Sequence, residues 1–298
     1  MKWQDLSMTF APLLAKTNSA LVTEVVVYPD CDEISDSGYA EYITVRNALR
    51  NLVKVPDSLS LEVACQLPCG ALKAFSAVRR AMPIVEEKSR ENTGPINLLI
   101  VGAGGLGLWT VKLAQHFIGS DCSKVHVTVA DTNLNKLLVA KECGCSDVIH
   151  WNDEMYEELL QERTLEVCEG GVDVIIDFVS SPRTVKRDLK VLRENGVLLV
   201  GGNSWHKVPI SIHRLAANNL SVIGIKNGTK EQLQELVNIM SQGPLTAPCY
   251  QVFPLDQAMT VFDLLNQSQI NGRAILEVTS DLAPLTDPFP STAELTSC

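Results

Sequence analysis

Short apolar runs alternate with helix-period stretches from about residue 96 to residue 225. Ile96–Val101 is a continuous apolar run, as is typical of a parallel strand that is buried on both faces. The stretch after it predicts a helix, because apolar side chains recur on one face as far as Phe117. Five further strands are predicted, at residues Val125–Ala130, Asp147–Ile149, Val172–Asp177, Val197–Val200 and Leu220–Ile225. Helices are predicted between them, over Asn133–Cys143, over Asp153–Val167 and from Pro182 onward. This alternation predicts an α/β fold with a doubly wound parallel sheet of the Rossmann type.

The first predicted strand runs directly into a glycine-rich turn, Gly102-Ala103-Gly104-Gly105-Leu106-Gly107. A G-x-G-x-x-G pattern indicates dinucleotide binding only between a strand and a helix, which is its context here. Gly102 permits the tight turn, Gly104 lets a pyrophosphate approach the backbone, and Gly107 lets the helix pack close to the strand. The N-terminus of the helix then offers N–H groups and a partial positive charge to the phosphates.

The next predicted strand is followed by Asp131, 24 residues beyond Gly107. This spacing is near that of the acid that accepts the adenosine ribose hydroxyls in dinucleotide folds. A carboxylate there would repel a 2′-phosphate and no Arg follows it immediately, so we expect NAD rather than NADP. The alternative is a Rossmann-like domain that binds another nucleotide or none, with Asp131 capping the next helix.

Composition narrows the class of protein. The 298 residues are 46% hydrophobic and 20% charged, which excludes wholesale disorder. The formal net charge of −10, without a Lys/Arg-dense stretch, argues against nucleic acid or a membrane surface as the main partner. No apolar run approaches the roughly 18 residues needed to span a bilayer, and residues 1–20 make a poor signal peptide. The odd count of nine cysteines suggests reduced thiols, so we expect a cytoplasmic protein.

Four segments occur in an order that resembles a known family: YAEY at residues 39–42, LVKVPDSLS at residues 52–60, VGAGGLG at residues 101–107 and GRAILEV at residues 272–278. On these motifs the chain resembles the medium-chain dehydrogenase/reductase superfamily, and within it the zinc-type alcohol dehydrogenases. The resemblance covers about residues 21–278. It implies a Rossmann domain at residues 73–228 and a partial, mostly β GroES-like catalytic domain at residues 1–72 and 229–298. We expect residues 279–298 to form a flexible tail.

The resemblance also implies cofactor contacts outside the glycine-rich turn, at Phe178, Val179, Val200, Gly201 and Gly202. Arg273 matches the family arginine that contacts the pyrophosphate. Without the GRAILEV motif, Arg273 would be interpreted as a solvated surface arginine. One departure stands at Lys73, where many relatives carry a Thr on the nicotinamide ribose side, so the inherited role of that position is in doubt.

The resemblance implies a catalytic zinc held by an early Cys, a His in a G-H-E motif and a later Cys, with one open position that stabilises the substrate alkoxide. Cys69 matches the later Cys, but the chain has no G-H-E motif and its first histidine is His116. We therefore expect Cys69 to be an ancestral ligand position and zinc binding by this chain to be doubtful. On the same resemblance, the segment that carries the other two ligands is expected ahead of Met1, as in an N-terminally truncated chain.

Other reactive residues carry weaker signals. Cys143 and Cys145 are read as buried thiols rather than a metal pair, and Cys65 with Cys69 cannot by themselves make a zinc site. His150, His206 and His213 are candidates for proton relay, and nothing in the sequence distinguishes among them.

Three functions remain open at this point. The first is an NAD-dependent oxidoreductase that interconverts an alcohol or polyol with its aldehyde or ketone, either active or inactive as this truncated chain. The second is a dinucleotide-binding protein without turnover. The third is a zinc-independent quinone or enone reductase of the same superfamily, which usually uses NADP. The resemblance implies a homo-oligomer paired at the strand Leu220–Ile225.

Overall fold

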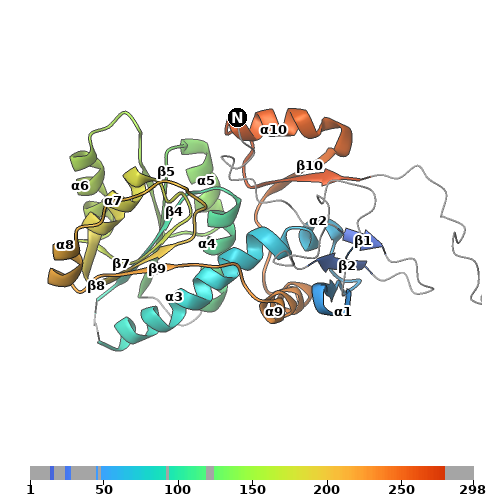
Figure 1. Ribbon diagram of the computed structural model, residues 1–298, viewed down its shortest axis with the longest axis horizontal. Coiled ribbons are helices and arrows are strands. Elements are labelled where there is room, and N and C mark those ends of the chain that lie inside the picture. The colour runs from blue at the N-terminus through green and yellow to red at the C-terminus, as the bar shows by residue number, and fades with distance from the viewer. Residues whose placement is uncertain are drawn as a thin grey trace, which may run out of the picture.

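A six-stranded parallel sheet forms the centre of the molecule (Figure 1). The computed structural model describes residues 14–16, 24–27, 45, 48–91, 94–118 and 124–278. Across the sheet the strands lie in the order β6-β5-β4-β7-β8-β9. In chain order they are β4 (Ile96–Val101), β5 (Val125–Asp131), β6 (Asp147–His150), β7 (Val172–Asp177), β8 (Leu192–Val200) and β9 (Ser221–Gly224). This is the doubly wound order of the Rossmann fold, so the predicted α/β fold class is confirmed.

The strands are apolar throughout because helices cover both faces of the sheet. In β4 the side chains alternate: Leu98 and Ile100 belong to one apolar core, and Leu99 and Val101 to the other. Every residue of β4 and of β7 is buried. A continuous apolar run is what a strand with two covered faces requires.

The first core lies under α3 (Leu72–Glu91), α4 (Gly105–Ile118), α5 (Leu134–Glu142) and α9 (Lys230–Ser241). The second core lies under α6 (Glu157–Val167), α7 (Pro182–Val191) and α8 (Ile212–Ala217), which form the left end of the molecule in Figure 1. The ends of these helices are capped locally. Ser181 and Thr184 form a capping box at α7, and Thr229 and Gln232 form one at α9.

Two predicted boundaries differ from the structure by more than two residues. The helix expected from Asp153 begins at Glu157, because Asn152 forms a turn: its side chain accepts from the N–H of Glu154 at 2.9 Å and its carbonyl from the N–H of Met155 at 3.1 Å. The strand expected at Val197 begins at Leu192, which pairs with Val172 across an irregularity in the register.

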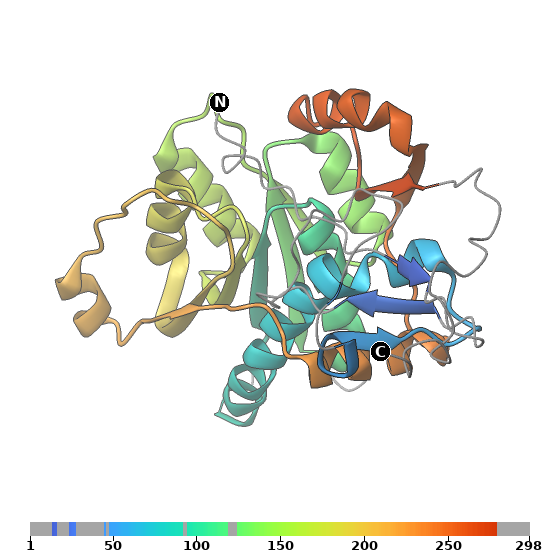
Figure 2. The same cartoon turned by 45° about the vertical axis from the view of Figure 1, so that its right-hand side comes forward.

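Short elements from both ends of the chain lie beside α3, α4 and α5, as Figure 2 shows. An antiparallel sheet is formed by β1 (Leu14–Lys16), β2 (Glu24–Val27) and β3 (Leu52–Lys54), and a parallel pair by β10 (Tyr250–Pro254) and β11 (Arg273–Glu277). The short helices are α1 (Ala48–Asn51), α2 (Leu61–Ala64) and α10 (Ala258–Asn266), the last preceded by the turn η2 (Leu255–Gln257). A wide helical turn, η1 (Leu67–Ala71), leads into α3.

The proposed division into two domains stays a prediction. Val53 of β3 and Leu233 of α9 belong to the same apolar core as Ile100 of the sheet, so the described parts pack as one unit. The YAEY motif and the tail at residues 279–298 lie outside the described residues. No helix in the described part of the chain combines the length and the apolar character that crossing a membrane demands.

Candidate functional site

The glycine-rich turn lies where the winding of the sheet reverses, between β4 and β7. From β4 the chain proceeds to β5 and β6 on one side, and later from β7 to β8 and β9 on the other. The loops after the two central strands meet, because the N–H of Phe178 donates to the carbonyl of Val101 at 3.1 Å. A crevice at the carboxyl ends of the strands at such a reversal is the usual ligand site of open α/β sheets.

Three glycines of the turn differ in whether the backbone could carry a side chain there. Gly102 has φ of +101°, which favours glycine. A Cβ on Gly107 would lie 2.9 Å from the carbonyl carbon of Gly102, so only glycine lets α4 pack this close. A Cβ on Gly104 would meet nothing within 4 Å. The predicted roles of Gly102 and Gly107 in shaping the turn therefore match the geometry, and Gly104 faces open space that a ligand could fill.

The open part of the turn coincides with the start of α4. Gly104, Gly105 and Leu106 are half-buried, whereas Gly102, Ala103 and Gly107 are buried. The first N–H groups of a helix have no acceptor within the helix, and they carry the positive end of its dipole. The partly exposed residues therefore offer N–H groups to an anion such as a pyrophosphate.

Asp131 ends β5 and connects it to the glycine-rich turn. One carboxylate oxygen accepts from the N–H of Ala103 at 2.7 Å, and the other accepts from the N–H of Asn133 at 2.8 Å. A carboxylate has about four acceptor positions, so it retains capacity for ribose hydroxyls. The alternative that Asp131 caps the next helix is wrong, because the side chain of Asn133 caps α5 by accepting from the N–H groups of Asn135 and Lys136.

The loops after β7 and β8 pack against each other at the same edge. The N–H groups of Gly201 and Gly202 both donate to the carbonyl of Asp177, at 2.8 and 3.2 Å. A Cβ on Gly201 would lie 2.9 Å from the ring of Phe178, so the two loops approach closely. Val200 ends β8 and Val179 is 48% exposed beside the turn. The structure thus brings the predicted cofactor residues of these loops together, and their contact with a cofactor stays a prediction.

A buried pair of carboxyl groups supports the loop after β7. Asp177 is fully buried and accepts from the N–H groups of Val179 at 2.7 Å and Ser180 at 2.8 Å, and from the hydroxyl of Thr184 at 2.9 Å. Burial raises the pKa of Asp177. Burial, followed by the charge of Asp177, raises the pKa of fully buried Asp188 well above its ordinary value. Burial beside Asp177 therefore favours the neutral form of Asp188, whose two carboxyl oxygens find no hydrogen-bond partner among the described residues.

Arg273 lies against the turn, although it is far from it in the sequence. A Cβ on Gly105 would lie 2.7 Å from its Cδ, and a Cβ on Gly70 would lie 2.8 Å from its Nε. The guanidinium is thus held between η1 and the start of α4, where the absence of two side chains makes room for it. This position fits the expected contact with a pyrophosphate, which remains to be tested. The part played by Gly70 could not be predicted from sequence patterns, because the residue that it accommodates is on β11.

The described residues do not fit a zinc site. Within the ranges that the structure describes, no three His, Cys, Asp or Glu side chains come together in a way that could hold a metal ion. Cys69, the predicted ligand position, is half-buried in η1. Nearby Cys65 is buried; burial and then the charge of Glu62 raise its pKa to about 12.

The remaining candidates are not gathered at the site. Cys143 and Cys145 are buried, as expected, and burial raises the pKa of Cys145 to about 11. His150 contacts the carbonyl of Thr132 at 2.9 Å near Asp131, whereas His206 and His213 are exposed elsewhere. Lys73 is half-buried in the first turn of α3.

Comparison with known proteins agrees with this geometry. Residues 105–242 match the family model described as zinc-binding dehydrogenase. The chain is 29% identical over 243 residues to an alcohol dehydrogenase of Geobacillus stearothermophilus, covering 82% of this chain and 65% of that protein. It is 28% identical to an NAD-dependent alcohol dehydrogenase of Sulfolobus acidocaldarius, and this match also covers 82% of this chain and 65% of that protein. The alcohol dehydrogenase of Aeropyrum pernix has the same fold, with a TM-score of 0.70 at 24% identity over 88% of this chain and 78% of that one.

These matches support a zinc-type alcohol dehydrogenase-like protein of the medium-chain dehydrogenase/reductase superfamily. The predicted resemblance is confirmed. This alcohol dehydrogenase-like chain spans about 65% of the length of the two relatives above.

Proposed function

We propose that this chain binds NAD and acts as an oxidoreductase that interconverts an alcohol or polyol with its aldehyde or ketone. The observation that carries the proposal is the joint placement of three features: the open backbone at Gly104, the carboxylate of Asp131 on the neighbouring strand, and the guanidinium of Arg273 over the first turn of α4. Bound nicotinamide supplies the acceptor or donor of hydride. The chain itself supplies the sites that hold the dinucleotide.

The charges of the site support binding of a dinucleotide. Arg273 and the N-terminus of α4 present positive charge to the two phosphates. Asp131 presents a carboxylate to the ribose hydroxyls, and the same negative charge disfavours a 2′-phosphate. NAD is therefore the proposed cofactor, in line with the name of the NAD-dependent relative from Sulfolobus acidocaldarius. One relative at 24% identity is named as a D-arabinose 1-dehydrogenase that uses NADP(+), so the preference needs a direct measurement.

A second candidate function is dinucleotide binding without turnover. It is favoured by one observation: among the described residues the proposed phosphate and ribose contacts lie together, whereas no three metal donors do. Cys69 is the proposed contributor to any zinc site, which would need further donors from outside the described residues. The third candidate, reduction of activated double bonds without zinc, is disfavoured by Asp131, since that branch usually uses NADP.

Assays of NADH formation with a panel of primary, secondary and polyhydric alcohols test the proposal. They should be run on the purified chain with and without added zinc, together with metal analysis. Turnover that depends on NAD and an alcohol supports the oxidoreductase. Saturable NAD binding without turnover in either condition supports the second candidate. Reduction of an enone by zinc-free protein, with no alcohol oxidation, would replace the proposal by the third.

A further inference from the structure

A second hollow lies in the helical layer on the other side of the sheet. It has a volume of about 610 Å³ and runs between α6, α7 and residues 209–214. Five cationic side chains and one carboxylate line it: Arg183, Lys186, Arg187, Lys190, Arg214 and Glu157. None of its lining residues belongs to the glycine-rich turn. We refer to it as the α7 groove.

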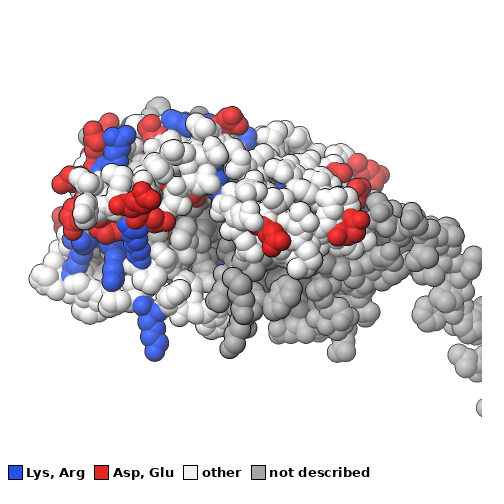
Figure 3. All heavy atoms as spheres, turned by 90° about the horizontal axis from the view of Figure 1, so that it is seen from above, with Lys and Arg blue, Asp and Glu red and all other residues white. Residues whose placement is uncertain are grey.

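The cationic lining is unusual for a chain with a net charge of −10. Figure 3 shows Lys and Arg side chains gathered at the left end of the molecule, the end that holds α6, α7 and α8, next to acidic ones. A concave surface with low-dielectric walls concentrates the field of such a group of charges. The groove therefore attracts anions, although the protein as a whole repels them.

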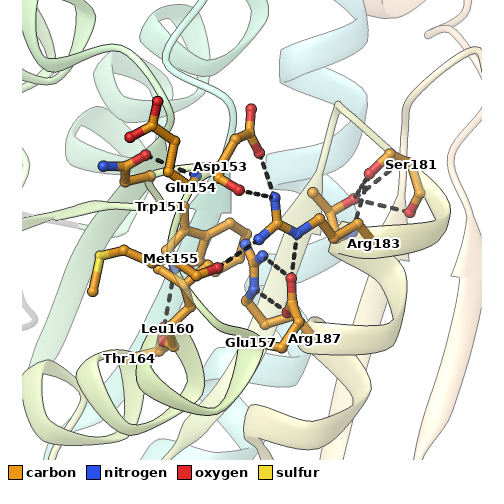
Figure 4. Close-up of polar contacts among 12 residues, drawn as sticks. Trp151, Asp153, Glu154, Met155, Glu157, Leu160, Thr164, Ser181, Arg183 and Arg187 are labelled. Carbon is orange, nitrogen blue, oxygen red and sulfur yellow. Dashed lines mark hydrogen bonds and ion pairs between the residues drawn. The ribbon is translucent and has the colours of Figure 1, made fainter.

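Two of the five cations are neutralised by acids and make the groove rigid (Figure 4). Arg187 is 2% exposed, and it donates to both carboxylate oxygens of Glu157, at 3.0 and 2.7 Å. Its guanidinium lies 4.3 Å from the ring centre of Trp151. Arg183 pairs with Glu157 and with Asp153. These contacts fix α6 to α7, so one wall of the groove is preformed.

The other three cations are available to a ligand. Lys186 and Lys190 lie one helical turn apart on α7, both are exposed, and neither has an ion-pair partner among the described residues. Arg214 faces them from the other wall. Its Nε donates to the carbonyl of Leu189 at 2.7 Å and its Nη2 to the carbonyl of Lys190 at 2.9 Å, so the guanidinium is held in place.

Between the cations the groove is apolar. Pro182, Leu189 and Pro209 contribute to its lining. The volume lies within the range of about 300–1,000 Å³ that is common for small-molecule sites. A ligand that fits both features has an apolar or aromatic body and a compact anionic group. Phosphate suits the cations best, because it accepts several charge-assisted hydrogen bonds from ammonium and guanidinium groups.

We propose that the α7 groove binds a small organic phosphate, with Lys186, Lys190 and Arg214 around the phosphate and the apolar lining against the body of the ligand. The site is separate from the cofactor site proposed above, and it does not depend on whether that site is active.

The test is calorimetric titration of the full chain with 1-naphthyl phosphate at low ionic strength, with NAD present in excess. The double variant Lys186→Gln/Lys190→Gln removes the two available ammonium groups without touching the Glu157 network. Lys54→Gln/Lys124→Gln removes two exposed lysines from other surfaces and serves as the charge-matched control. Melting temperatures of both variants verify the fold. Arg214 is left intact because it bonds the last carbonyls of α7.

We expect saturable binding by the wild type and by the control, weakened at least about tenfold in Lys186→Gln/Lys190→Gln, a factor equal to about 1.4 kcal/mol. Neutral 1-naphthol should bind much more weakly than its phosphate. Absence of saturable binding would overturn the proposal, as would equal weakening in both double variants. Tighter binding of a Glu-rich peptide than of naphthyl phosphate, lost in the same variant, would overturn the assignment to a small phosphate.

Discussion

The carboxylate of Asp131 accepts a hydrogen bond of 2.7 Å from the backbone N–H of Ala103. This bond ties the end of β5 to the glycine-rich turn that follows β4. The residue proposed to bind the ribose thus also shapes the loop proposed to bind the phosphates. A change at Asp131 should therefore alter both cofactor preference and stability.

Replacing Asp131 by Asn removes the negative charge and keeps the size. We expect the ratio of NADP to NAD affinity to rise by about tenfold or more, because the repulsion of a 2′-phosphate is lost. The melting temperature should fall slightly, since Asn has one acceptor oxygen for the N–H groups of Ala103 and Asn133. Fluorescence titration with NADH and NADPH measures the ratio. Asp147→Asn, at the amino end of β6, is the control and should leave it unchanged.

Two glycines of the turn should respond oppositely to a methyl group. Gly107→Ala should lower the free energy of unfolding by about 1–3 kcal/mol, because the new Cβ would collide with the backbone of Gly102. Gly104→Ala should leave stability nearly unchanged, because the Cβ enters open space. Urea denaturation of the two variants makes the comparison, and equal losses would show that the turn is built differently.

Glu157 should stabilise the protein in a pH-dependent manner. Burial opposes its ionisation, but hydrogen bonds from Arg187 and Arg183 outweigh that effect and lower its pKa. A carboxylate whose pKa is lowered on folding contributes stability above its unfolded pKa of about 4.3, and the contribution is lost as pH falls through the folded value. Glu157→Gln should therefore cost about 1–2 kcal/mol at neutral pH, a figure reduced for partial exposure, and less in acid. Exposed neighbour Glu158→Gln should show no such trend.

Asp188 should show the reverse dependence. Its pKa is raised on folding, so its contribution to stability is complete below an unfolded pKa of about 3.9 and declines as pH rises toward the folded value. Asp188→Asn keeps the size of the buried side chain and cannot ionise. We expect the variant to be more stable than the wild type at neutral pH, by about 1 kcal/mol or more, and to lose that advantage near pH 4. Exposed Asp57→Asn is the control. A pH-independent difference would show that folding does not raise the pKa of Asp188.

The sheet was predictable because each strand is specified locally. The bounds predicted for Ile96–Val101 and Val172–Asp177 agree with β4 and β7, since an apolar run marks a strand covered on both faces. The start of the predicted helix at Asp153 was wrong because the polar residues after β6 form a turn that helical periodicity does not reveal. Spacing also sufficed for Gly102 and Gly107, whose roles depend on neighbours in the sequence.

Contacts between distant segments were not predictable from patterns. The position of Arg273 depends on two glycines, Gly70 and Gly105, that belong to other elements. The α7 groove combines three segments, and its lysines look like an ordinary solvated helix face in the sequence. The raised pKa of Asp188 depends on burial beside Asp177, which periodicity indicates only approximately.

Calorimetric titration of NADH into the wild type and into Gly104→Val tests the central claim most directly. Open space around a Cβ at Gly104 predicts that the variant folds, and its melting temperature verifies this. The proposed site predicts that the wild type binds one NADH per chain and that the variant binds at least about tenfold more weakly, because the side chain occupies the approach to the backbone. Equal affinity of the two proteins, or no binding by the folded wild type, would contradict the account.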